Sequence, residues 1–83
     1  MQTYYFHLRN GSDVLLDPEG RSLPSIEAVA AAAMREARAL ISAEVTTGKV
    51  SLISYIDVED QAGQVVHTLS FEDAVRIERG TST

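Results

Sequence analysis

One long amphipathic helix between two pairs of short strand-like runs is the layout that most constrains this chain. Residues that favour strands fill the runs at 4–9, 14–16, 52–60 and 65–69. Between the two pairs, residues 25–48 carry apolar side chains at spacings of three and four, which is the period of a helix with one buried face. These elements fill nearly all of an 83-residue chain, so there is little room for a separate catalytic insert.

The helix has clear end signals and an apolar stripe. Ser25 can accept a hydrogen bond from a free amide of the first turn, Glu27 suits the helix dipole there, and Gly48 stands where a C-terminal cap is expected. The phase of the apolar positions predicts that one stripe packs on one side of the sheet. The helix residues of this contact are Val29, Ala33, Ala37 and Leu40, and the sheet residues are Phe6, Leu8, Ile56 and Val58.

Turn chemistry separates the strands. Asn10-Gly11 predicts a tight hairpin, because both residues tolerate positive φ. Residues 17–20, Asp-Pro-Glu-Gly, have the profile of a type I turn. The residues that follow it, up to Leu23-Pro24, are interpreted as a connection to the helix, and 70–73 resemble a capping box that opens a short terminal helix containing Ala74, Val75 and Ile77.

The sequence therefore predicts an α+β fold. We expect an antiparallel sheet of three to four strands with one long helix packed on one face, in the order ββαββ. Residues 1–78 form a single domain and 79–83 a flexible C-terminal tail. The order of the strands within the sheet stays open.

Composition excludes several classes of function. The chain has no cysteine, which excludes disulfides and cysteine-ligated metal centres and suits a reducing cytoplasm. A formal charge of −5 without a basic stripe argues against nucleic acid as a partner. The chain shows no signal peptide and no apolar run of about 18–20 residues, so we expect no membrane partner.

Several segments resemble a family of small bacterial proteins with a domain of unknown function. They are residues 5–11 (Tyr-Phe-His-Leu-Arg-Asn-Gly), 17–20, Leu23-Pro24, the Ala/Glu/Arg-rich helix, Val58-Glu59-Asp60 with Gly63, and 71–75. The resemblance covers roughly residues 4–76 and implies a fold and a bacterial origin, but no activity and no catalytic residue. His67 departs from the pattern, since an aliphatic residue is more usual there.

The chain offers no recognised catalytic, cofactor or metal motif. His7 and His67 could share a metal ion with nearby carboxylates if their strands were neighbours, but neither belongs to a motif such as His-Glu-x-x-His. No serine stands on a Gly-x-Ser-x-Gly elbow. We therefore expect a protein that is not an enzyme and that holds no cofactor.

A single helix covers only one face of a sheet, so the other face is the candidate working surface. Strand alternation places five residues there: Tyr5, His7, Arg9, Tyr55 and Asp57. Tyrosine and arginine are common at binding hot spots, and the alternative is a solvated sheet face without a function. The leading hypothesis is a non-enzymatic protein-interaction or regulatory module of the cytoplasm, acting as a homodimer or on a small protein partner. The alternatives are an antitoxin-like inhibitor that neutralises a basic partner, and a small metal-binding protein or enzyme.

Overall fold

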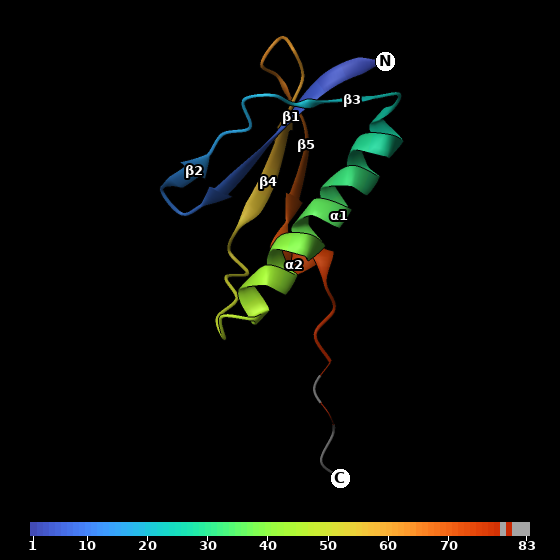
Figure 1. Cartoon of the computed structure of the whole chain (residues 1–83). Coiled ribbons are helices and arrows are strands. Elements are labelled where there is room, and N and C mark those ends of the chain that lie inside the picture. The colour runs from blue at the N-terminus through green and yellow to red at the C-terminus, as the bar shows by residue number, and fades with distance from the viewer. Residues whose placement is uncertain (79, 81–83) are drawn as a thin grey trace.

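The computed structural model describes residues 1–78 and 80. Its elements are, in chain order, β1 (Gln2–Asn10), β2 (Asp13–Leu15), β3 (Arg21–Leu23), α1 (Ile26–Val45), β4 (Tyr55–Glu59), β5 (Val65–Ser70) and α2 (Phe71–Ala74). Figure 1 shows α1 lying along one side of the sheet, while the hairpin of β1 and β2 projects away from it. The predicted α+β class is confirmed, with one long helix on an antiparallel sheet.

The sheet is antiparallel and has the order β2-β1-β4-β5, with β3 pairing to the start of β1. The sheet has five strands rather than the predicted three to four. The additional strand is β3, which lies in the segment predicted to be a connection to the helix. Both β2 and β3 pair with β1, β2 near its end at Asn10 and β3 near its beginning at Gln2. The turn after β2 carries the chain back beside β1, and this tertiary pairing makes a strand of three residues that have little strand pattern of their own.

Helix α1 begins and ends close to the predicted positions. The Ser25 hydroxyl accepts a hydrogen bond from the Ala28 amide at 3.1 Å, as its place before the helix predicts. The helix ends at Val45, and Gly48 follows with φ +86°, a conformation that glycine adopts easily. At this end the partly buried Glu44 carboxylate lies outside the core and accepts a hydrogen bond from the Ser51 amide.

The core lies between α1 and the facing side of the sheet. Its buried residues are Tyr4, Phe6, Val29, Ala32, Ala33, Ala37, Ile41, Ile56, Val58, Leu69, Phe71 and Ala74. The predicted stripe is confirmed at Val29, Ala33 and Ala37, whose small side chains let the helix approach the strands closely. Leu40 is only partly buried and packs at the rim of the core, while Ile41 takes the buried position. Replacing Leu40 by alanine should therefore lower the free energy of unfolding by less than the same change at a fully buried leucine.

The chain after β5 differs from the prediction in one respect. The Ser70 hydroxyl caps α2 by accepting from the Asp73 amide, as the capping pattern predicts. However, α2 ends at Ala74, and Val75 is already extended with φ −135°, so the helix stops before Ile77. The Arg38 side chain of α1 donates a hydrogen bond to the Ala74 carbonyl at 2.8 Å, which ties the two helices together at this point. Residues 79 and 81–83 of the predicted tail lie outside the described residues.

Of the helices in the described part of the chain, none combines the length and apolarity needed to cross a membrane.

Candidate interaction face

The side of the sheet that faces away from α1, called the open face below, carries all five predicted site residues. It is formed by Tyr5, His7 and Arg9 of β1, Tyr55, Asp57 and Glu59 of β4, and Thr68 of β5. The register of β1 and β4 places Tyr5 opposite Glu59, His7 opposite Asp57, and Arg9 opposite Tyr55. Directly opposed residues of an antiparallel pair share a face, so these side chains are neighbours.

The charged groups of the open face are paired with one another. Arg9 Nε donates to Asp57 Oδ2 at 2.7 Å, and Arg9 Nη2 lies 4.0 Å from Glu59 Oε2. The Thr68 hydroxyl from β5 donates to the other Asp57 oxygen at 2.9 Å. Asp57 of β4 therefore links β1 and β5, and these two contacts hold its carboxylate in one orientation.

His7 is buried beneath neighbouring residues of the open face and has little access to solvent. It is 8% exposed, and its ring stacks on Tyr5 with the ring planes 8° apart. His7 Nδ1 accepts a hydrogen bond from the Asp17 amide at 3.0 Å, and Nε2 lies 3.5 Å from Glu59 Oε1. An acceptor at Nδ1 requires that this nitrogen carry no proton, so the proton of neutral His7 is on Nε2, toward Glu59. The accessible surface of the open face is therefore formed mainly by the exposed Thr68 and by the partly exposed Tyr5, Arg9, Tyr55 and Glu59.

Asp17 is the residue that organises this edge of the sheet, and sequence reasoning assigned it only a turn. On the edge of β1 that faces away from β4, β2 pairs with residues 8–10 and β3 with residues 2–4, so neither strand pairs with residues 5–7. The Asp17 carboxylate occupies this position on the edge. One carboxylate oxygen accepts from the Phe6 amide at 3.1 Å, and the other accepts from the amides of Glu19 and Gly20. The Asp-Pro-Glu-Gly pattern signalled the local turn bonds, but it carried no sign of the bond to a residue eleven positions earlier.

The two histidines do not come together. His67 of β5 lies opposite Val58 of β4, on the side that faces α1, while His7 lies on the open face. β4 also separates their strands in the sheet. The alternative of a metal site shared by both histidines is therefore ruled out by the register. Among the described residues, no cluster of three or more histidine, aspartate or glutamate side chains could hold a metal ion.

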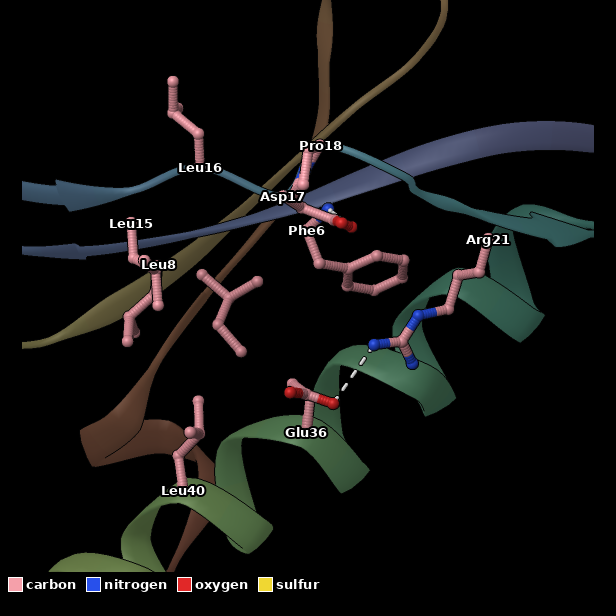
Figure 2. Close-up of a pocket in the computed structure, with 10 residues that line it drawn as sticks. Phe6, Leu8, Leu15, Leu16, Asp17, Pro18, Arg21, Glu36 and Leu40 are labelled. Carbon is pink, nitrogen blue, oxygen red and sulfur yellow. Dashed lines mark hydrogen bonds and ion pairs between the residues drawn. The ribbon is translucent and has the colours of Figure 1, made fainter.

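A pocket lies on the other side of the sheet, between the β1–β2 hairpin and α1. A helix is about 10 Å wide and covers only about two strands, so the strands beyond it overhang. Figure 2 shows Leu8, Leu15 and Leu40 pointing into this space, with the Arg21–Glu36 ion pair at one end. Arg21 also lies over the Phe6 ring at 4.4 Å from its centre. The pocket has a volume of about 300 Å³ and is mostly apolar.

A comparison with known protein families shows to which family the chain belongs. The family described as Domain of unknown function (DUF6894) matches residues 3–72, which is most of the chain. This chain belongs to the DUF6894 family. The predicted resemblance to a domain of unknown function is thus confirmed. No curated protein and no solved structure matches the chain.

The pKa of Asp17 in this DUF6894 domain reflects its position in the sheet. Burial raises the pKa of the carboxyl group, but the hydrogen bonds from the amides of Phe6, Gly20 and Glu19 and the charge of Arg21 outweigh burial. The net result is a pKa below the ordinary aspartate value of 3.8. The carboxylate form is therefore the form that the fold stabilises.

Replacing Asp17 by alanine should destabilise the DUF6894 domain. The amide of the buried Phe6 would lose the acceptor of a partly buried hydrogen bond, which costs about 1–3 kcal/mol. Urea denaturation followed by circular dichroism measures this change. Asp13→Ala is the matched control, since Asp13 is exposed at the start of β2 and its loss should stay within about 0.5 kcal/mol. Equal midpoints for the two variants would contradict the role given to Asp17.

The contribution of Asp17 should also depend on pH. Because its pKa is lowered in the folded state, the stabilisation is complete above the ordinary value of 3.8 and is lost as pH falls through the folded pKa. We expect the stability difference between wild type and Asp17→Ala to be constant from neutral pH down to about pH 4 and to shrink below it. A difference that grows on acidification would mean that the pKa shift has the opposite sign.

Proposed function

We propose that this DUF6894 domain is a non-enzymatic protein-interaction module that contacts a basic partner protein through its open face. The observation that supports this most is the placement of Tyr5 and Tyr55, two half-buried tyrosines on a sheet face that neither helix covers in the described part of the chain. Held by the sheet, these rings lose little side-chain entropy on binding, which is one reason tyrosine is frequent at hot spots.

The charges of the open face favour a basic partner. Asp57 and Glu59 provide two carboxylates against the single guanidinium of Arg9, and the chain as a whole carries −5. A lysine or arginine of the partner could lie against Glu59 and stack on a tyrosine ring. Because the existing groups are already oriented by their mutual bonds, such a partner meets a preorganised surface.

The setting that we propose is the cytoplasm of a bacterium. The cysteine-free sequence suits a reducing compartment, and the resemblance noted above implies a bacterial origin. Regulation of a partner protein is compatible with this role, whereas a chemical step would need groups that the face does not offer, since its histidine is buried and bonded through Nδ1.

The test is the affinity of a purified partner for wild type and for the double variant Tyr5→Ala, Tyr55→Ala. The partner is first isolated by affinity capture from the native host and then titrated by calorimetry. We expect the double variant to weaken binding at least about tenfold, and added salt to weaken binding to the wild type further. Arg35→Ala, on the exposed side of α1, is the matched control and should bind as wild type does.

Two outcomes would overturn this proposal. One is equal affinity of the wild type and the folded double variant. The other is a wild-type dimer that the double variant converts to a monomer in light scattering, since the occupant of the open face would then be a second copy of the chain.

A further inference from the structure

The free edge of the sheet at β2 carries three consecutive apolar residues that are largely exposed. Val14 is 46% exposed, Leu15 66% and Leu16 62%. Edge strands of soluble proteins usually carry charged side chains or proline, because unpaired backbone groups invite pairing with another strand. The only charged residues here, Asp13 and Asp17, flank the triplet, and the Asp17 carboxylate points inward to the Phe6 amide.

The backbone of this edge is ready for one more strand. A two-residue hairpin loop is closed by a hydrogen-bonded pair, here Asn10 with Asp13, and such pairs alternate along an antiparallel ladder. The backbone groups of Leu15 therefore face β1, as does the Asp17 amide that donates to His7. Val14 and Leu16 alternate with these residues along the strand, so their amide and carbonyl groups point away from the sheet.

We propose that β2 pairs with β2 of a second copy of this chain, antiparallel and with the twofold axis at Leu15. In that register Val14 of each copy lies opposite Leu16 of the other, so every apolar residue meets an apolar residue. Registers shifted to place Val14 opposite itself or Leu16 opposite itself would set Leu15 against Asp13 or Asp17. The triplet is thus self-complementary in one register, which is what a twofold interface requires.

The pocket beside α1 adds to this interface. In Figure 2 the Leu15 side chain points into the pocket toward Leu8 and Leu40, whereas the side chain of Leu16, which also borders the pocket, points away from them. In the paired arrangement Leu15 of the second copy lies beside this Leu15, at the open mouth of the pocket. Pairing would therefore cover apolar surface on both sides of the sheet.

The hairpin tip allows the two copies to approach. Gly11-Ser12 of the second copy would pass beside the Pro18 turn, and these are small side chains. The result is one continuous sheet whose two open faces lie on the same side. An interface built on three residues per copy is small, so we expect a weak dimer that forms at high concentration. This pairing does not use Tyr5 or Tyr55, the two residues that test partner binding at the open face, so the two proposals are tested by different variants.

The test uses sedimentation velocity on four forms of the full chain. We expect wild type to be dimeric at about 500 μM, and Leu15→Lys and Val14→Pro to raise the dimer dissociation constant at least about tenfold. Val14→Pro removes only an amide that points away from β1, so circular dichroism should show a folded variant. Ile53→Lys is the matched control, because Ile53 is 73% exposed and lies off this edge, and it should dimerise as wild type does.

Because the chain contains no cysteine, Leu15→Cys gives a second readout. Opposed residues of a non-hydrogen-bonded antiparallel pair lie close enough for a disulfide, so mild oxidation should give a covalent dimer, whereas Ile53→Cys should not. A wild type that stays monomeric at the highest concentration would overturn the proposal. A folded Leu15→Lys variant that dimerises as wild type does would also overturn it.

Discussion

Replacing Phe71 by alanine should lower the free energy of unfolding by about 3–5 kcal/mol, the largest effect expected for a single truncation in this chain. Phe71 is 1% exposed and is the largest of the fully buried side chains. Its ring belongs to the core, and its amide donates to the Ser54 carbonyl at 2.9 Å. Removing the ring would open a cavity where α2 packs on α1 and β5.

A loss of this size is a large fraction of the stability of such a small domain, which is about 4–12 kcal/mol on the usual scale per residue. Urea denaturation of wild type and Phe71→Ala measures it. Ile77→Ala is the matched control, because Ile77 follows in the same segment but is 65% exposed, and its truncation should cost less than about 0.5 kcal/mol. A Phe71→Ala variant within about 1 kcal/mol of wild type would place Phe71 outside the core.

Replacing Gly20 by alanine should be the second most damaging change, for two separate reasons. Gly20 has φ +70°, where an L-residue costs about 1–2 kcal/mol. A Cβ atom there would also lie 2.8 Å from Thr3 Cγ2, 2.9 Å from the Tyr4 carbonyl oxygen and 2.9 Å from Tyr5 Cε2. The carbonyl belongs to the β1 backbone and cannot move easily, so overpacking should add about 1–3 kcal/mol.

Gly48→Ala separates the two causes. Gly48 has φ +86°, but a Cβ atom there would meet nothing within 4 Å, so only the conformational cost applies. We expect Gly20→Ala to be clearly less stable than Gly48→Ala in thermal unfolding, and to shift the aromatic NMR signals of Tyr5. Equal melting temperatures for the two variants would show that the Asp17 turn does not pack closely on β1.

Periodicity explains why most of the fold could be predicted. The spacing of three and four in the helix and the alternation of Tyr4, Phe6 and Ile56 placed both apolar surfaces correctly, because burial on one side of an element imposes these periods on its sequence. Caps such as Ser25 and Ser70 could be recognised because their hydrogen bonds are local.

The features that were missed depend on contacts between distant parts of the chain. β3 is a strand because it pairs with β1, and Asp17 matters because its carboxylate reaches the Phe6 amide. Phe71 was interpreted only as part of a capping pattern, although it is a main core residue. None of these roles follows from neighbouring residues, so no local pattern could have indicated them.

The sequence predicts which residues lie on the open face, but not which of them are buried or what they bond to. Alternation places Tyr5, Arg9 and Tyr55 on one side of the sheet without any knowledge of strand order. That His7 would be buried against the Asp17 amide required knowing that the turn after β2 folds back on the middle of β1.

Site-specific photo-cross-linking tests the role of the open face most directly. A photoreactive phenylalanine analogue is placed at Tyr55 in cells of the native host, and at Ala39 on the exposed side of α1 as the control. We expect one recurrent protein adduct from Tyr55, with its cross-link next to basic residues of the partner, and no such adduct from Ala39. Adducts that form equally at both positions, or at Ala39 alone, would contradict the open face as the surface that binds a partner.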